Sequence, residues 1–353
     1  MSDQVRAALA AVVEGRALGR DEARLAMGAI MDGEATPAQL AALLVALRMR
    51  GETVDELAGF ALAMRERVVR VEAPPGTIDT CGTGGDGRGT FNISTAAALV
   101  AAAAGVPVAK HGNRAITSQS GSSDVLEALG IPVEQTPEEA AASLREDGFA
   151  FLFAPGFHPA MRHAGPTRRE IGIRTAFNLL GPLTNPAGAT RQLIGTAEPT
   201  AAARLAMVSQ ALGVERAFIV HGDRIDELPL DGTGVLYDVS PDGVRQQTVT
   251  TRGLGLRRAA TEQLTGGSPA ENAVLIEAIL AGASGPRRDV VLLNAGAALQ
   301  VAGRAGSLAE GISIAAEAID SGRAASLLDR LRARRARKSP APEAGAGAPV
   351  AAR

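Results

Sequence analysis

The spacing of apolar residues predicts helices over the first seventy residues. Four leucines between positions 40 and 47 recur at i, i+3, i+4 and i+7, which places them on one face of a helix. Thr36 and Pro37 suit the N-cap and the first position of this helix. Thr53 and Glu56 have capping-box spacing at the start of a second helix with a similar apolar face. Helices this small and apolar need a partner surface, either the rest of the chain or a second subunit.

Beyond residue 73, short β-like runs alternate with Ala- and Leu-rich helical stretches. The predicted strands are Thr77–Thr80, Val106–Lys110, Phe149–Phe153, Ala217–His221 and Val290–Asn294. The helical stretches between them include Ser94–Ala104, Asp124–Leu129 and Pro199–Leu212. Two further runs, Val235–Val239 and Gln246–Thr251, predict a hairpin at one edge. This alternation predicts an α/β domain with a mostly parallel central sheet.

Three parts of the chain follow from these patterns. We expect a small N-terminal helical domain over residues 1–72, to which helices near 165–190 could also belong. A large α/β domain is expected over 73–332. We expect residues 333–353 to be a disordered tail, because a basic cluster there leads into a Pro/Ala/Gly-rich stretch with almost nothing to pack.

Composition excludes several classes of protein. With 46% hydrophobic and 21% charged residues among 353, the chain can bury a sizeable core. A net charge of −2 argues against a broad basic face for nucleic acid. One cysteine and four histidines argue against a disulfide framework or a cysteine zinc site. The apolar run 96–108 is too short for a membrane span, and the first residues do not resemble a secretory signal, so we expect a cytoplasmic protein.

The segment Asp79–Thr95 carries five glycines between a predicted strand and a predicted helix. Glycine lets backbone N–H groups approach an anion, and a helix N-terminus adds partial positive charge. The segment lacks the Gly-Lys-Ser/Thr of a P-loop and the spacing of the dinucleotide fingerprint. It therefore fits a phosphate or pyrophosphate site, although glycine content alone leaves a plain surface loop equally open.

A second donor-rich loop, Lys110–Asp124, follows the next predicted strand. A polar crossover loop would explain it alone, but two such loops after two strands favour an anionic, phosphorylated ligand. Asp226 and Glu227 follow a later strand on an irregular loop, where both carboxylates can face a cation such as Mg²⁺. Taken alone, such a carboxylate pair is more often a surface feature.

Several motifs occur in an order that resembles the anthranilate phosphoribosyltransferase family. They are GTGGD from Gly82, NIST from Asn92, KHGNRA from Lys110, the stretch His158–Pro186, Asp226-Glu227-Leu228, and LLNAGAAL from Leu292. The resemblance covers the chain to about Arg332. It implies a nucleoside phosphorylase/phosphoribosyltransferase-like fold, with a small helical domain that dimerises and a large α/β domain.

The resemblance also implies a set of site residues. Those expected to bind substrate are Gly82, Gly85, Asp86, Thr90, Asn92, Ile93, Ser94, Thr95, Lys110, His111, Gly112, Asn113, Arg114, Ala115, Ile116, Thr117, Ser118, Ser122 and Arg168. Within this set, Asn113 and Arg168 resemble the residues that hold anthranilate. Ser94, Asp226 and Glu227 resemble the Mg²⁺ ligands, and His111 is the candidate proton acceptor.

The implied reaction is transfer of the phosphoribosyl group of phosphoribosyl pyrophosphate to the amine of anthranilate, the second step of tryptophan biosynthesis from chorismate. The expected partners are these two substrates and a second copy of the chain, with neither nucleic acid nor membrane. Two alternatives remain at this level. One is a pyrimidine nucleoside phosphorylase-like enzyme, which would need no magnesium. The other is a non-catalytic relative that binds nucleic acid.

Overall fold

The N-terminal part of the chain is a bundle of helices. The computed structural model describes residues 2–84, 87–115, 119–222 and 225–338. The first four helices are α1 Asp3–Val13, α2 Arg20–Met31, α3 Pro37–Arg50 and α4 Val54–Arg65. Thr36 and Thr53 cap α3 and α4 through their side chains, each within a capping box, as their spacing predicts. The four leucines of α3 are buried.

The rest of the chain is built on a seven-stranded sheet. Its strands are β1 Ile78–Gly82, β2 Val108–Gly112, β3 Phe149–Phe153, β4 Arg191–Gly195, β5 Arg216–His221, β6 Gly234–Ser240 and β7 Gly243–Val249. They lie in the order β3-β2-β1-β4-β5-β6-β7. The first five are parallel, and β6 and β7 add an antiparallel hairpin at one edge. The mostly parallel sheet and the edge hairpin are as predicted.

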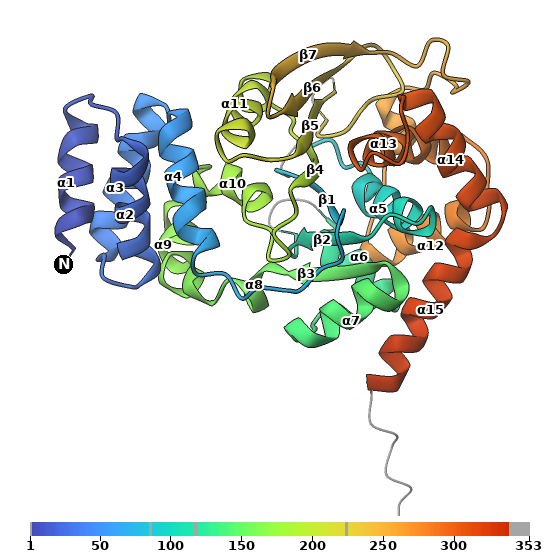
Figure 1. Ribbon diagram of the computed structural model, residues 1–353, viewed down its shortest axis with the longest axis horizontal. Coiled ribbons are helices and arrows are strands. Elements are labelled where there is room, and N and C mark those ends of the chain that lie inside the picture. Colours follow the sequence, from blue (N-terminus) through green and yellow to red (C-terminus); the bar gives the residue numbers. More distant parts are fainter. Residues whose placement is uncertain (1, 85–86, 116–118, 223–224, 339–353) are drawn as a thin grey trace, which may run out of the picture.

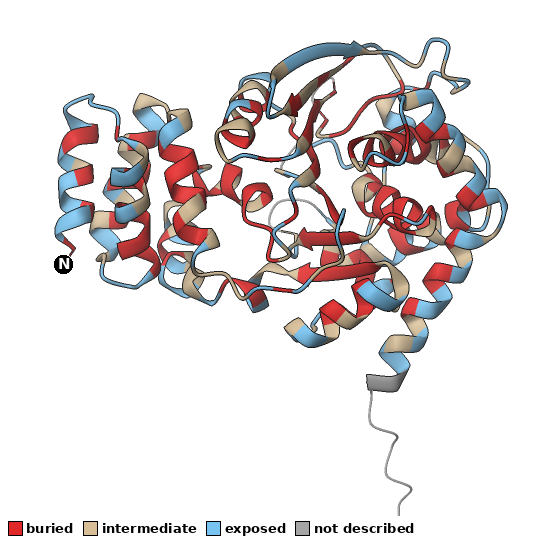
Figure 2. Ribbon diagram, in the orientation of Figure 1, coloured by how far each residue is buried: buried red, intermediate tan, exposed pale blue. Residues whose placement is uncertain are grey.

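Helices cover both faces of the sheet, which gives three layers (Figure 1). The longer ones are α5 Ile93–Ala103, α6 Ser122–Ala128, α7 Pro137–Asp147, α11 Pro199–Ala211, α12 Pro269–Leu280, α13 Pro286–Val301, α14 Leu308–Asp320 and α15 Arg323–Lys338. Short segments are α8 Ala154–Phe157, α9 Gly165–Ile171 and α10 Phe177–Leu180, with 3₁₀ turns at Pro159–His163, Gly181–Leu183 and Thr261–Leu264. Buried residues concentrate in α5, α13 and the central strands (Figure 2).

Two helices from the middle of the chain lie against the bundle. Residues of the α9–α10 region, among them Ala164, Phe177 and Leu180, share one hydrophobic cluster with α2, α3 and α4. That cluster continues through α11 to one face of the sheet, where Ile194 and Ile219 are buried. The bundle is thus joined to the α/β layers by continuous apolar packing rather than by the linker alone.

One predicted strand is wrong, and one strand of the sheet was not predicted. Val290–Asn294, predicted as a strand, lies within α13, because a helix buried on all sides has an apolar run without visible periodicity. The central strand β4 was not among the predicted strands, although it pairs with both β1 and β5.

The segment expected to be disordered from residue 333 begins as helix. α15 continues to Lys338, and Arg334 pairs with Asp147 and Glu146 of α7. These ion pairs and the buried Leu331 tie the helix to the domain. The apolar run near residue 100 forms the buried α5. Within the described part of the chain, no helix is long and apolar enough to cross a membrane.

Candidate active site

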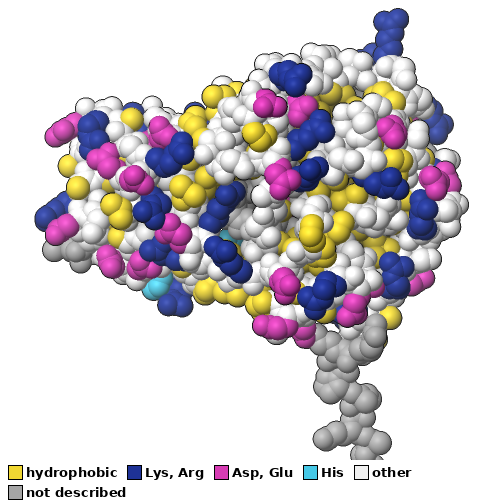
Figure 3. Space-filling view, viewed as in Figure 1, with side chains coloured by type: hydrophobic (Ala, Val, Ile, Leu, Met, Phe, Trp, Pro, Cys, Tyr) yellow, Lys and Arg dark blue, Asp and Glu magenta, His cyan; other side chains and the backbone are white. Residues whose placement is uncertain are grey.

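The expected site residues gather at the carboxyl-terminal edge of the parallel strands. β1 ends at Gly82, β2 at Gly112 and β4 at Gly195, and Gly82 and Gly195 are register partners. Open α/β sheets bind ligands at this edge, where the loops after neighbouring strands meet. Lys and Arg side chains border the hollow between the bundle and the α/β part of the molecule in Figure 3.

Gly84 belongs to the glycine-rich segment between β1 and α5, here called the glycine loop, and connects it to the loop that carries Asp226. The Gly84 N–H donates to Asp226 Oδ2 over 3.2 Å, and Gly84 has a left-handed φ of +65°. A Cβ on Gly82 would lie 2.3 Å from the same carboxylate oxygen, so glycine lets the two loops approach this closely. Gly85 and Asp86 lie outside the described residues.

At the start of α5, the groups available to a ligand are mainly backbone N–H donors rather than side chains. Ile93 and Thr95 are buried, so their side chains face the core. The amide group of Asn92 is held by neighbouring segments, and Thr90 pairs in an isolated β-bridge. The N–H groups of a first helical turn have no acceptor within the helix. This terminus can therefore meet a phosphate through its N–H groups and the hydroxyl of Ser94.

Lys110 lies in the floor of the site and is only 2% exposed. Its Nζ donates to a backbone carbonyl of β1 over 2.5 Å and to Ser94 Oγ over 3.3 Å. Burial lowers the pKa of Lys110, whereas the carboxylate of Asp79 acts to raise it. Asp226 and Glu227 act on Lys110 in the same direction as Asp79. The ammonium is thus surrounded by the groups expected to hold phosphate and metal.

His111 and His158 form a buried pair beside this floor. Their Nε2 atoms are 3.2 Å apart, and His111 Nδ1 lies 3.2 Å from the carbonyl oxygen of Gly181. A carbonyl accepts, so we assign the proton of a neutral His111 to Nδ1. Burial lowers the pKa of His111 to about 3 and that of His158 to about 4. Both imidazoles are therefore neutral at pH 7.

Arg114 is engaged within the protein. Its Nη1 donates to Asp124 over 3.1 Å and to Glu127 over 3.0 Å, both on α6, and its guanidinium lies over the ring of Phe153. A substrate phosphate would have to compete with two carboxylates for this side chain. The expectation that Arg114 binds substrate therefore requires these ion pairs to rearrange.

The other residues of this loop place small and polar groups at the end of β2. Asn113 is exposed, and its Oδ1 accepts a hydrogen bond from the next N–H over 2.8 Å. A Cβ on Gly112 would lie 2.3 Å from Ser122 Oγ, so glycine lets α6 begin close to the strand. The Ala115 N–H donates to Asp124 over 3.0 Å. Within this loop, the expected residues Ile116, Thr117 and Ser118 lie outside the described part of the chain.

Asp226, Glu227 and Ser94 provide the oxygen donors that suit Mg²⁺. The carboxylate of Asp226 occupies the space that the missing side chain of Gly82 leaves open. Lys110 donates a hydrogen bond to Ser94, and the charges of Asp226 and Glu227 both act to raise its pKa. Among the described residues, no cluster of three or more His, Cys, Asp and Glu side chains could hold a metal by itself. This donor set fits an ion that also takes substrate phosphate oxygens and water as ligands.

Among the described residues, the guanidinium of Arg168 has no acidic partner. It lies on α9, 4.7 Å above the ring of Phe177, and burial lowers its pKa. Among the residues that the structure describes, no carboxylate pairs with it and no acceptor takes a hydrogen bond from its side chain. A half-buried, unpaired guanidinium beside an aromatic ring is suited to an aromatic carboxylate. Its neighbour Arg169 is exposed.

Comparison with known proteins identifies the family. Residues 74–325 match the model of the glycosyl transferase family α/β domain, and residues 6–68 match that of its helical bundle domain. The anthranilate phosphoribosyltransferase of Symbiobacterium thermophilum is 52% identical over 93% of this chain and 97% of its own. The chain belongs to the anthranilate phosphoribosyltransferase family. The family member of Azorhizobium caulinodans is 48% identical over 98% of this chain and 100% of its own.

Solved structures agree with this assignment. The anthranilate phosphoribosyltransferase of Thermus thermophilus superposes with a TM-score of 0.89 at 47% identity, covering 93% of this chain and 99% of that one. The Saccharomyces cerevisiae family member in complex with phosphoribosyl pyrophosphate and Mg gives 0.87 at 26% identity, covering 96% and 99%. Another structure of the yeast protein holds 4-fluoroanthranilate, with a TM-score of 0.84 at 25% identity over 95% and 100%.

Three residues of the site architecture escaped the sequence interpretation. Asn294 exchanges hydrogen bonds with the backbone of Leu228, directly after the two acidic residues, over 3.0 and 3.1 Å. Gly195 lies against the carbonyl of Asp226, and Arg174 reaches Gly84. Each contact joins segments at least thirty residues apart, so no local pattern could reveal it. Asn294 stood in the LLNAGAAL motif and Arg174 in the stretch His158–Pro186, but neither motif indicates the partner of its residue.

Proposed function

We infer that this chain transfers the phosphoribosyl group of phosphoribosyl pyrophosphate to the amine of anthranilate, which yields N-(5-phosphoribosyl)anthranilate and pyrophosphate. This inference rests mainly on sequence identity: 52% and 48% of the aligned residues are identical to those of two named family members, over nearly their full length. The guanidinium of Arg168 supports it, because it pairs with no carboxylate of the described residues and so offers a site for the carboxylate of the acceptor. This is the second step of tryptophan biosynthesis.

The residues at the sheet edge suit departure of pyrophosphate. The amine nitrogen forms a bond to the anomeric carbon as the bond from that carbon to the pyrophosphate oxygen breaks. Negative charge grows on the leaving group, where the first-turn N–H groups of α5 and the ammonium of Lys110 can stabilise it. Bound Mg²⁺, held by Asp226, Glu227 and Ser94, would neutralise further charge on the phosphates.

The amine must lose a proton after the new bond forms. Anthranilate is neutral at its nitrogen at pH 7, so no base is needed to create the nucleophile. The arylammonium product is itself acidic, so a weak acceptor suffices. We propose His111 for this role, because its neutral ring has Nε2 without a proton in the assigned tautomer. In that tautomer Nε2 accepts a hydrogen bond from His158 Nε2, so this contact must open before Nε2 takes the proton of the amine.

The test is conversion of anthranilate, followed through its fluorescence, with phosphoribosyl pyrophosphate and with or without magnesium. The chain has no tryptophan, so background emission is low. We expect loss of signal only when magnesium is present. The double variant Asp226→Asn, Glu227→Gln should lose turnover yet keep its melting temperature. A wild-type protein that leaves the signal unchanged would refute the function. A double variant with unchanged magnesium dependence would refute the metal site alone.

We further propose a cytoplasmic homodimer formed through the helical bundle. Val13 at the end of α1 is 70% exposed and Met49 at the end of α3 is 83% exposed, which leaves apolar side chains of neighbouring helices in water. We expect light scattering to give twice the chain mass, and Met49→Asp to shift the population towards monomer. A monomer mass for the wild-type protein at micromolar concentration would contradict this. The single cysteine, which cannot form an internal disulfide, suits a reducing compartment.

A further inference from the structure

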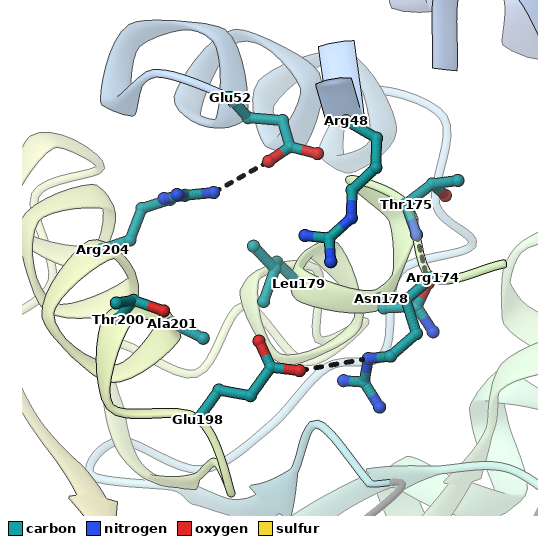
Figure 4. Close-up of a pocket in the computed structure, with 10 residues that line it drawn as sticks. All are labelled: Arg48, Glu52, Arg174, Thr175, Asn178, Leu179, Glu198, Thr200, Ala201 and Arg204. Atoms are coloured by element: carbon teal, nitrogen blue, oxygen red, sulfur yellow. Dashed lines mark hydrogen bonds and ion pairs between the residues drawn. The ribbon is translucent and has the colours of Figure 1, made fainter. Parts of the chain in front are cut away.

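A charged cleft lies between the helical bundle and the α/β part of the chain (Figure 4). Arg48 and Glu52 line it from the bundle, and Arg174, Glu198 and Arg204 line it from the other side. Arg204 pairs with the buried Glu52 over 2.8 Å, which makes a fixed contact across the cleft. The guanidinium of Arg48 points into the cleft (Figure 4).

Arg174 differs from the other arginines of this cleft because it reaches the glycine loop. Its Nη1 donates to the carbonyl oxygen of Gly84 over 2.9 Å, while its Nε lies 3.9 Å from a carboxylate oxygen of Glu198. The N–H of Gly84 donates to Asp226. The residue at the start of the loop is therefore held from both sides, by a proposed metal ligand on one and by Arg174 on the other.

Gly84 needs such contacts because little else restricts it. A Cβ at this position would meet nothing within 4 Å, and glycine is free to leave its left-handed φ of +65°. The residue before it is fixed by the N–H of Thr83, which donates to the Gly195 carbonyl over 2.9 Å. The chain thus leaves the sheet at Gly84, and the hydrogen bond from Arg174 holds the backbone of that residue.

Resting on the proposed function, we propose that Arg174 is a positioning residue that fixes Gly84, where the chain leaves β1, for binding of the diphosphate of phosphoribosyl pyrophosphate. It follows α9 through Gly172, whose φ is +68°, so it belongs to the same short segment as Arg168. One segment therefore carries the proposed carboxylate contact for the acceptor and the anchor for the loop that receives the donor. Fixing Gly84 before binding removes part of the ordering cost that would otherwise reduce the affinity for the substrate.

The test compares steady-state constants for wild type, Arg174→Ala and Arg174→Lys. We expect Arg174→Ala to raise KM for phosphoribosyl pyrophosphate roughly 10-fold, the order expected when one residue must be ordered on binding. KM for anthranilate and the melting temperature should change little. Arg174→Lys should restore part of the loss, because an ammonium can still donate to the Gly84 carbonyl.

Two matched variants separate this role from a general effect of the cleft. Arg204→Ala breaks the pair with Glu52 and should lower the melting temperature without raising KM for phosphoribosyl pyrophosphate. Glu198→Gln removes the carboxylate that lies 3.9 Å from Arg174. It should leave KM for phosphoribosyl pyrophosphate nearly unchanged, because the hydrogen bond from Arg174 to Gly84 stays in place. An unchanged KM in Arg174→Ala, or an equal rise in Arg204→Ala, would overturn the proposal.

Failure of the proposed function would look different. If the wild-type protein does not consume anthranilate, calorimetric binding of phosphoribosyl pyrophosphate with magnesium replaces the kinetic assay. Arg174→Ala should then weaken that binding by the same factor. If the wild-type protein binds none, the role of Arg174 is refuted together with the function.

Discussion

Replacing Gly195 by alanine should disable the site by displacing the backbone of Asp226. Gly195 ends β4 beside Gly82, and its missing Cβ leaves room for the loop that follows β5. An added Cβ would lie 1.6 Å from the carbonyl oxygen of Asp226 and 2.6 Å from its carbonyl carbon. Both contacts are with backbone atoms, so no side-chain rotation relieves them.

The size of the displacement sets the expected loss. Moving the Cβ–oxygen contact from 1.6 Å to the 3.0 Å limit seen in proteins requires about 1.4 Å of separation. A misplacement of about 1 Å can cost about 100-fold in rate, so kcat/KM should fall by at least that factor. Overpacking costs about 1–3 kcal/mol, which lowers the melting temperature of a chain this size by roughly 1–4 °C.

The assay is the fluorescence-monitored reaction over a range of magnesium concentrations, with thermal unfolding measured in parallel. Gly82→Ala should lose less activity, because its Cβ would meet the Asp226 carboxylate, a side chain that can turn away. Gly306→Ala is the control, since its Cβ would meet only the flexible Glu310 at 3.4 Å. Activity of Gly195→Ala within about 3-fold of wild type would refute the reasoning. If that variant fails to fold, the activity of Gly82→Ala is the test: it should be lower than that of wild type, and equal activity would refute the reasoning.

Two further predictions concern the acceptor and the buried histidines. Arg168→Ala should raise KM for anthranilate by roughly 10- to 150-fold, the cost of a charge-assisted hydrogen bond, whereas the exposed Arg169→Ala should be near neutral; equal effects in steady-state assays would contradict the assignment. With folded pKa values of about 3 for His111 and about 4 for His158, protonation near the unfolded value of 6.5 favours the unfolded chain. The free energy of unfolding, measured by urea titration, should therefore fall from pH 7 towards 4, by up to about 1.4 kcal/mol per pH unit and histidine. His158→Gln should flatten this slope, and an unchanged slope would exclude the pair as its source.

Local signals determined much of the fold. Thr36 and Thr53 cap their helices as predicted, because an N-cap hydrogen bond joins residues only three positions apart and therefore depends on local sequence alone. The sequence also predicted the glycine-rich segment and the edge hairpin, since neighbouring residues determine turns and short strands. The order of motifs indicated the family, which the comparisons bear out. The individual site residues carried over with it remain predictions.

Tertiary structure decided what local patterns cannot express. The strand predicted at Val290–Asn294 is a helix, because its apolar run is buried from all sides and periodicity vanishes there. β4 became central because it could be buried between β1 and β5. The closest contacts of the site, Gly195 with Asp226 and Arg174 with Gly84, join residues 31 and 90 positions apart. Sequence supplies the glycine and the arginine, but only the packed sheet brings their partners within reach.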